Sequence, residues 1–172
     1  TDTDVTAFRD HQLTLHTIIK VMLGAVPPPS ERQALDRAIT ATYSSAGITH
    51  DPASWGRPAP LLADLAATLG ADADPDAQQM AARLAPWVAG TFKDLFDGPT
   101  STRPEGHLVV WSLRHLPDEL RTIGTLLTLN HIWGRIDQTA SGNHRAKRLV
   151  VVDEAGLLMR DGEGARFLSR MA

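Results

Sequence analysis

Two short apolar runs on either side of a long amphipathic stretch most constrain the fold of this chain. One run spans His107 to Trp111 and the other spans Arg148 to Val152. Both are rich in valine, which is typical of buried strands. Between them, apolar residues recur at helical spacing from Pro117 to Asp137. A strand, a helix and a second strand in this order predict a βαβ unit with two parallel strands.

The part of the chain before these runs reads as helical throughout. Helices are expected from Asp4 to Ala25, from Ser30 to Ser45, from Leu61 to Leu69, and from Pro75 onward with a break at Pro86; a last one is expected from about Glu163. Ser30 with Gln33 forms a capping-box pattern, and Gly47 suits the position just after a helix end. The fold class predicted is therefore α/β and predominantly helical, with an all-helical part at 1–98 and an α/β part at 99–172.

Composition excludes several kinds of site. The 172 residues contain no cysteine, which rules out disulfides, thiolate zinc sites, iron–sulfur clusters and cysteine nucleophiles. The formal net charge of −3 argues against a dedicated nucleic-acid module. No apolar stretch reaches the length of about 20 residues that a membrane span needs. A two-stranded parallel sheet needs cover on both faces, so we expect this chain to be a piece of a longer protein.

Two adjacent acids, Asp153 and Glu154, directly follow the second apolar run. Ligands of open α/β sheets bind beyond the carboxyl ends of the strands. A carboxylate there can hold the Mg²⁺ of a bound nucleotide, as the Walker B acid of P-loop ATPases does. In that interpretation Asp153 holds the metal through water, and Glu154 orients and polarises the attacking water. The alternative is a strand that ends in two solvated acids. The phosphate-binding pattern G-x-x-x-x-G-K-[ST] does not occur in the sequence.

Four stretches of the sequence resemble the C-terminal motor portion of the conjugative-transfer and type IV secretion ATPases (the CagE/TrbE/TraC family). They are Glu31 to Ile39 with Tyr43; Leu84 to Phe92 with Leu95 to Thr100; Leu108 to Leu113 with Leu116 to Leu120; and Val150 to Ala155 with Leu157 and Leu158. They lie in the family's order and cover most of residues 31–168. Where the family usually has a large aromatic residue after Asp-Glu-Ala, this chain has Gly156.

The resemblance implies a RecA-like P-loop ATPase with a lid-like helical insertion, here residues 1–98, before a partial RecA-like portion with the Walker B strand, residues 99–172. It implies that Asp153 and Glu154 are the Walker B acids, and that ATP and Mg²⁺ bind to the intact parent protein only. It also implies a hexameric motor in the cytoplasm, peripheral to the inner face of the cell membrane, with secretion-channel proteins and other copies of itself as partners. The isolated chain is not expected to hydrolyse ATP.

Other candidate residues favour structural roles. The seven histidines include no His-x-x-x-His or Glu-x-x-His pair, so we interpret them as structural or solvated. The basic run from His144 to Arg148 is either a phosphate contact or a solvated linker. Trp55, in a loop rich in Pro and Gly, is the aromatic residue best suited to a partner contact. Two alternatives to the motor remain: a non-catalytic helical interaction domain, and a related DNA-translocating ATPase.

Overall fold

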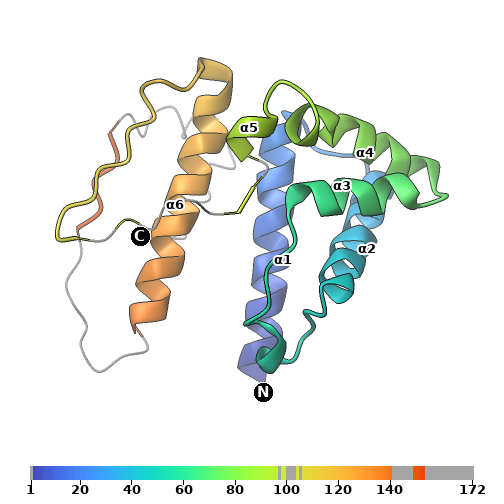
Figure 1. The fold of residues 1–172 in the computed structure, drawn as a ribbon, viewed down its shortest axis with the longest axis horizontal. Coiled ribbons are helices and arrows are strands. Elements are labelled where there is room, and N and C mark those ends of the chain that lie inside the picture. The colour runs from blue at the N-terminus through green and yellow to red at the C-terminus, as the bar shows by residue number, and fades with distance from the viewer. Residues whose placement is uncertain (1, 97, 100–103, 105, 141–148, 154–172) are drawn as a thin grey trace. The chain divides into compact units, whose positions relative to one another are not determined.

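The computed structural model describes residues 2–96, 98–99, 104, 106–140 and 149–153. The chain divides into two compact units, residues 1–105 and 106–172. The helices are α1 (Asp2–Leu23), α2 (Pro29–Ser45), α3 (Leu62–Ala71), α4 (Pro75–Val88), α5 (Lys93–Phe96) and α6 (Asp118–Ala140), with a short 3-10 turn at Pro52–Ser54. Figure 1 shows their course. The helices predicted up to residue 140 are thus present, with ends shifted by a few residues, and the one predicted from about Glu163 lies outside the described residues.

Helices α2, α3 and α4 pack on one another and form the core of the first unit. Their fully buried side chains are aliphatic and recur at helical spacing: Leu35, Ile39, Leu69, Met80 and Leu84. Helix α1 adds Phe8, Ile19 and Met22 to the buried set. Burying one such side chain stabilises a fold by about 1.5–3 kcal/mol. The core therefore rests on the apolar stripes that the sequence displays.

Two of the predicted helix boundaries are confirmed in detail. Gly47 adopts φ +72°, and the amides of Gly47 and Ile48 donate to the carbonyls of Ser44 and Tyr43. This is the Schellman arrangement that a glycine after a helix permits. Asp74 caps α4 by accepting a hydrogen bond from the Asp76 amide at 3.0 Å. Pro75 then occupies the first helical position, where its missing N–H costs nothing.

The predicted capping box at Ser30 is wrong. Helix α2 begins one residue earlier, at Pro29, and its N-cap, Pro28, makes no side-chain hydrogen bond. The ring of a proline at the first helical position already fixes φ near the helical value, which favours a helix that begins at Pro29 over one that Ser30 caps. Helix α4 continues through Pro86 and ends at Val88, so the predicted helix is split two residues after the proline and not at it. Beyond this end, the Phe92 amide donates to the Pro86 carbonyl at 3.0 Å.

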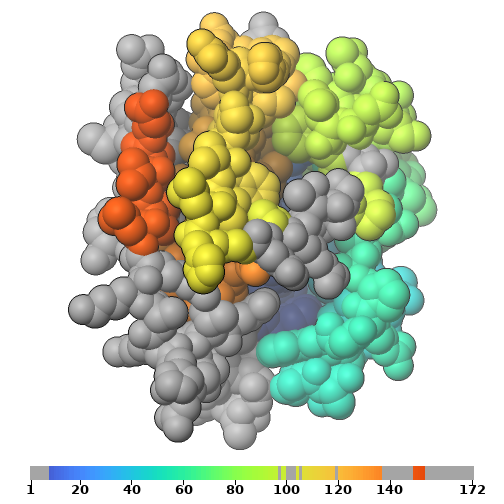
Figure 2. Space-filling model, turned by 60° about the vertical axis from the view of Figure 1, so that its left-hand side comes forward, coloured from blue at the N-terminus to red at the C-terminus, as the bar shows by residue number. Residues whose placement is uncertain are grey.

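The two apolar runs of the second unit are not assigned as strands. Neither residues 107–113 nor residues 149–153 form a β-bridge with any described residue. Figures 1 and 2 show the two segments running side by side. Leu108 and Leu149 are 84% and 89% exposed, so the prediction that these runs are buried is wrong for part of their side chains. Within the described part of the chain, no layer of side chains covers these two leucines, and the sequence pattern does not reveal whether such a layer exists. The strand–helix–strand arrangement therefore stays a prediction.

Candidate functional site

The candidate Walker B position follows the second apolar segment. Asp153 lies at a turn directly after residues 149–152 and its side chain is exposed. Glu154, the predicted catalytic acid, lies outside the described residues, as does the basic run from His144 to Arg148. Of the two predicted acids the structure thus describes Asp153 alone, and the Walker B role of both stays a prediction.

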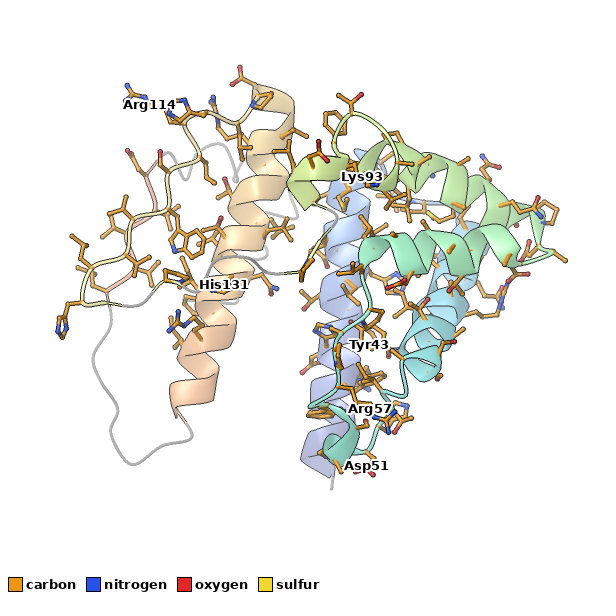
Figure 3. The ribbon with its side chains drawn as sticks, viewed as in Figure 1. Tyr43, Asp51, Arg57, Lys93, Arg114 and His131 are labelled. Carbon is orange, nitrogen blue, oxygen red and sulfur yellow. The ribbon has the colours of Figure 1, made fainter. Side chains whose placement is uncertain are left out.

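The first apolar segment is held against α6 by side chains of its inner face. Trp111 packs edge-on against His131 of α6, with ring centroids 5.3 Å apart and planes inclined at 63°. Figure 3 shows His131 on the side of α6 that carries this segment. Further along, Leu113 and Leu116 lie close to Gly124, where an added Cβ would come within 2.5 Å of a Leu116 methyl. Gly124 thus lets this part of the chain approach α6 closely.

His131 carries a buried ring nitrogen. Its Nε2 atom has no hydrogen-bond partner among the described residues. The other predicted structural histidine of this segment, His107, is exposed. No group of three or more His, Asp or Glu side chains in the described part of the chain could hold a metal ion. The interpretation of the histidines as structural or solvated therefore stays a prediction.

Two ion pairs join α2 to α4. Arg83 of α4 donates to Glu31 of α2 at 2.5 Å, and the Glu31 side chain is only 4% exposed. Arg37 of α2 donates to Asp74, the α4 cap, at 2.6 Å. The hydrogen bond from Arg37, with a second one from the Asp76 amide, holds the pKa of Asp74 below its usual value. Local sequence patterns do not indicate the Glu31–Arg83 pair, because its members are 52 residues apart.

A cluster of rings connects α1 to α2. The His11 ring nitrogen Nε2 is hydrogen-bonded to the Tyr43 hydroxyl at 2.8 Å, and Phe8 packs edge-on against the Tyr43 ring. Partial burial lowers the pKa of His11 and raises that of Tyr43, because it disfavours the charged form of each. His16 reaches α2 separately and pairs with Asp36 at 3.2 Å. The two histidines, five positions apart on α1, thus both reach the same neighbouring helix.

The loop that carries Trp55 is held in one shape by its own hydrogen bonds. The indole N–H of Trp55 donates to the Thr49 carbonyl at 2.9 Å. The Asp51 carboxylate accepts from the Ala53 amide at 3.0 Å, and the Ser54 hydroxyl accepts from the Thr49 amide at 2.9 Å. Trp55 is 38% exposed. These hydrogen bonds hold the indole in one orientation at the surface. That Trp55 contacts a partner protein stays a prediction.

A magnesium ion fits this chain only in part. An exposed carboxylate such as Asp153 is the kind of oxygen ligand that Mg²⁺ prefers. The backbone cradle for nucleotide phosphates is absent from the 172 residues, since none of their glycines belongs to the required pattern. Asp153 could therefore contribute a ligand, and the phosphate site would have to come from another segment of polypeptide.

Comparison with known proteins shows a solved structure whose fold this chain resembles. No protein-family model matches the sequence, and no curated protein matches it significantly. Among solved structures, the chain is similar to VirB4 of Thermoanaerobacter pseudethanolicus, with a TM-score of 0.77 and 23% sequence identity. The match covers 91% of this chain and 59% of the VirB4 chain. This likeness confirms the resemblance to the type IV secretion ATPases at the level of the fold. No helix among the described residues is long and apolar enough to cross a membrane.

Proposed function

We propose that this chain is part of a motor ATPase that powers conjugative DNA transfer or type IV secretion, through assembly of a channel or pilus. The observation that carries the proposal is the match to VirB4 over 91% of the chain. The position of Asp153 at the end of an apolar extended segment supports it, since phosphoryl-transfer sites take their metal-binding acids from such positions.

Within this function the residues have separate roles. The helical unit is the lid-like insertion, and the second unit is the partial RecA-like portion with the Walker B strand. Asp153 binds Mg²⁺ through water and Glu154 positions the attacking water. Both depend on a rigid mount, because catalysis of phosphoryl transfer consists mostly of positioning and charge stabilisation. ATP and Mg²⁺ bind to the intact parent protein, a cytoplasmic oligomer, expected to be a hexamer, at the inner face of the membrane beside channel proteins.

The test uses the polypeptide that the intact gene encodes. It should contain G-x-x-x-x-G-K-[ST] before the position of Thr1, and it should hydrolyse ATP in the presence of Mg²⁺. Glu154→Gln should reduce turnover by at least about 100-fold while ATP binding persists, since it removes a water-positioning group and not a binding group. Asp94→Asn, a change at an exposed acid of α5, is the matched control and should leave turnover unchanged.

Two results would overturn the proposal. The absence of any phosphate-binding pattern from the encoded polypeptide would leave the non-catalytic interaction domain as the function. Turnover by the 172-residue chain alone that disappears on Glu154→Gln would show that the phosphate site lies within this chain, contrary to the division proposed above.

A further inference from the structure

The first extended segment of the second unit ends in a turn that carries an arginine. The Leu116 amide donates to the Leu113 carbonyl at 3.1 Å, so residues 113–116 form a turn with Arg114 and His115 at its corner. Figure 3 shows the Arg114 side chain pointing away from α6. Arg114 thus extends from the point where the first segment gives way to the helix that follows it.

This turn is fixed on α6 by close packing. Methyl groups of Leu113 and Leu116 lie next to Gly124 of α6, and an added Cβ at Gly124 would come within 2.5 Å of the Leu116 methyl. Only a residue without a side chain lets Leu116 approach α6 so closely. The hydrogen bond within the turn and the packing of the two leucines therefore fix the backbone from which Arg114 extends.

Arg114 and Asp153 lie at the same edge of the two extended segments. Helix α6 carries the chain back from the end of the first segment toward the start of the second, and the two segments lie side by side (Figures 1 and 2). Segments joined in this way run in the same direction, so their carboxyl ends meet at one edge. Arg114 directly follows the first of these ends, and Asp153 directly follows the second.

Arg114 differs from the other arginines that the structure describes in this unit. Arg121 pairs with Asp118 at 2.7 Å. Arg135 lies in the C-terminal half of α6, which runs away from this edge. Arg114 makes no ion pair with any residue in the described part of the chain. Its guanidinium therefore keeps its donors for another acceptor, and the planar fork of an arginine matches the oxygens of a phosphate.

We infer that Arg114 binds the terminal phosphate of the nucleotide and makes the site prefer a triphosphate to a diphosphate. This role rests on the proposed function, in which Asp153 holds the Mg²⁺ of the nucleotide and Glu154 positions the water that attacks the terminal phosphate. A cation at the edge that carries these acids is on the side of the terminal phosphate. It can neutralise negative charge that a triphosphate has there and a diphosphate lacks.

Nucleotide binding by the polypeptide that the intact gene encodes tests this role. Calorimetry in the presence of Mg²⁺, with either a non-hydrolysable ATP analogue or ADP, gives both Kd values without turnover. Arg114→Gln should weaken binding of the analogue at least about tenfold and change the Kd of ADP less than about twofold, because it removes a charge-assisted contact to the terminal phosphate. Arg114→Lys keeps the positive charge and should restore most of the affinity. Arg32→Gln, at an exposed arginine of α2, is the matched control and should leave both Kd values unchanged.

The outcomes separate this role from the proposed function. A wild-type polypeptide that binds neither nucleotide overturns the proposed function and the role of Arg114 with it. If the wild type binds both nucleotides and Arg114→Gln binds the analogue just as tightly, only the role of Arg114 is overturned. An equal loss of affinity for the analogue and for ADP overturns it as well, because ADP has no terminal phosphate of this kind to lose. Far-UV circular dichroism verifies that each variant is folded.

Discussion

The pair between Glu31 and Arg83 gives the sharpest test of how the helical unit is held together. Glu31 is 4% exposed and Arg83 is 28% exposed, and their closest atoms are 2.5 Å apart. Arg83→Met removes the charge and keeps an apolar stem, which leaves a buried carboxylate without its partner. Breaking a buried pair in this way costs about 3–5 kcal/mol. We expect the lower end, about 3 kcal/mol, because Glu31 lies in the first turn of α2, where the helix dipole favours an anion.

Replacing the other partner, Glu31, should lower stability less, because Arg83 is more exposed than Glu31. Glu31→Gln leaves an arginine whose guanidinium can turn toward water, and we expect a cost of about 1–2 kcal/mol. The double variant has no uncompensated charge, so it should be more stable than the sum of the single costs implies. The cycle should therefore give a coupling energy of about 2 kcal/mol.

Hydrogen exchange measured by mass spectrometry suits this cycle better than a global melting curve. The chain has two compact units, and a single unfolding transition is not assured for such a chain. Exchange of the α2 and α4 amides reports the free energy of opening in the unit that contains the pair. If Arg83→Met cost less than about 1 kcal/mol, or if Glu31→Gln cost more than Arg83→Met, the reasoning from burial would be refuted.

Two further predictions concern the same unit. The pKa of His11 is lowered in the fold, so the unfolded chain binds more protons once the pH falls below 6.5; the His11 contribution to stability is therefore full above that pH and is lost as the pH falls through the folded pKa. Urea titrations of the wild type and His11→Gln at several pH values should converge at low pH. A constant difference in stability between the two would contradict this. Gly47→Ala places a Cβ on a residue at φ +72° and against the Arg57 guanidinium, so it should lower the free energy of unfolding by at least about 1 kcal/mol. Gly24→Ala, at φ +64° with no neighbour within 4 Å, is the control for the backbone strain alone. An equal loss of stability in the two variants would show that Arg57 moves aside.

Features set by neighbouring residues could be predicted from the sequence. Gly47 ends α2 and Asp74 with Pro75 begins α4, because each device acts within one turn of the chain. The start of α2 was predicted wrongly for the same local reason, since two competing signals lie side by side at Pro29 and Ser30.

Contacts between distant residues could not be predicted in this way. The hydrogen bond between His11 and Tyr43 joins residues 32 positions apart, and nothing in either local pattern indicates the partner. His16 pairs with Asp36 although its spacing from His11 gave no reason to expect both on one partner helix. The valine-rich runs indicated a surface that needs cover, but the exposure of Leu149 shows that the pattern does not reveal whether cover is present.

The exposure of Leu149 and Val151 also bears on the acid that follows this segment. Asp153 directly follows Val152, and a metal-binding carboxylate acts only when its mount is rigid. A segment covered on one side alone lacks half of the packing that fixes a strand in an α/β sheet. If the rest of the proposed parent motor covers Leu149 and Val151, it should therefore reduce the mobility of residues 149–153. The chain alone would then be poorly suited to phosphoryl transfer for two separate reasons, a missing phosphate cradle and an incompletely packed acid-bearing segment.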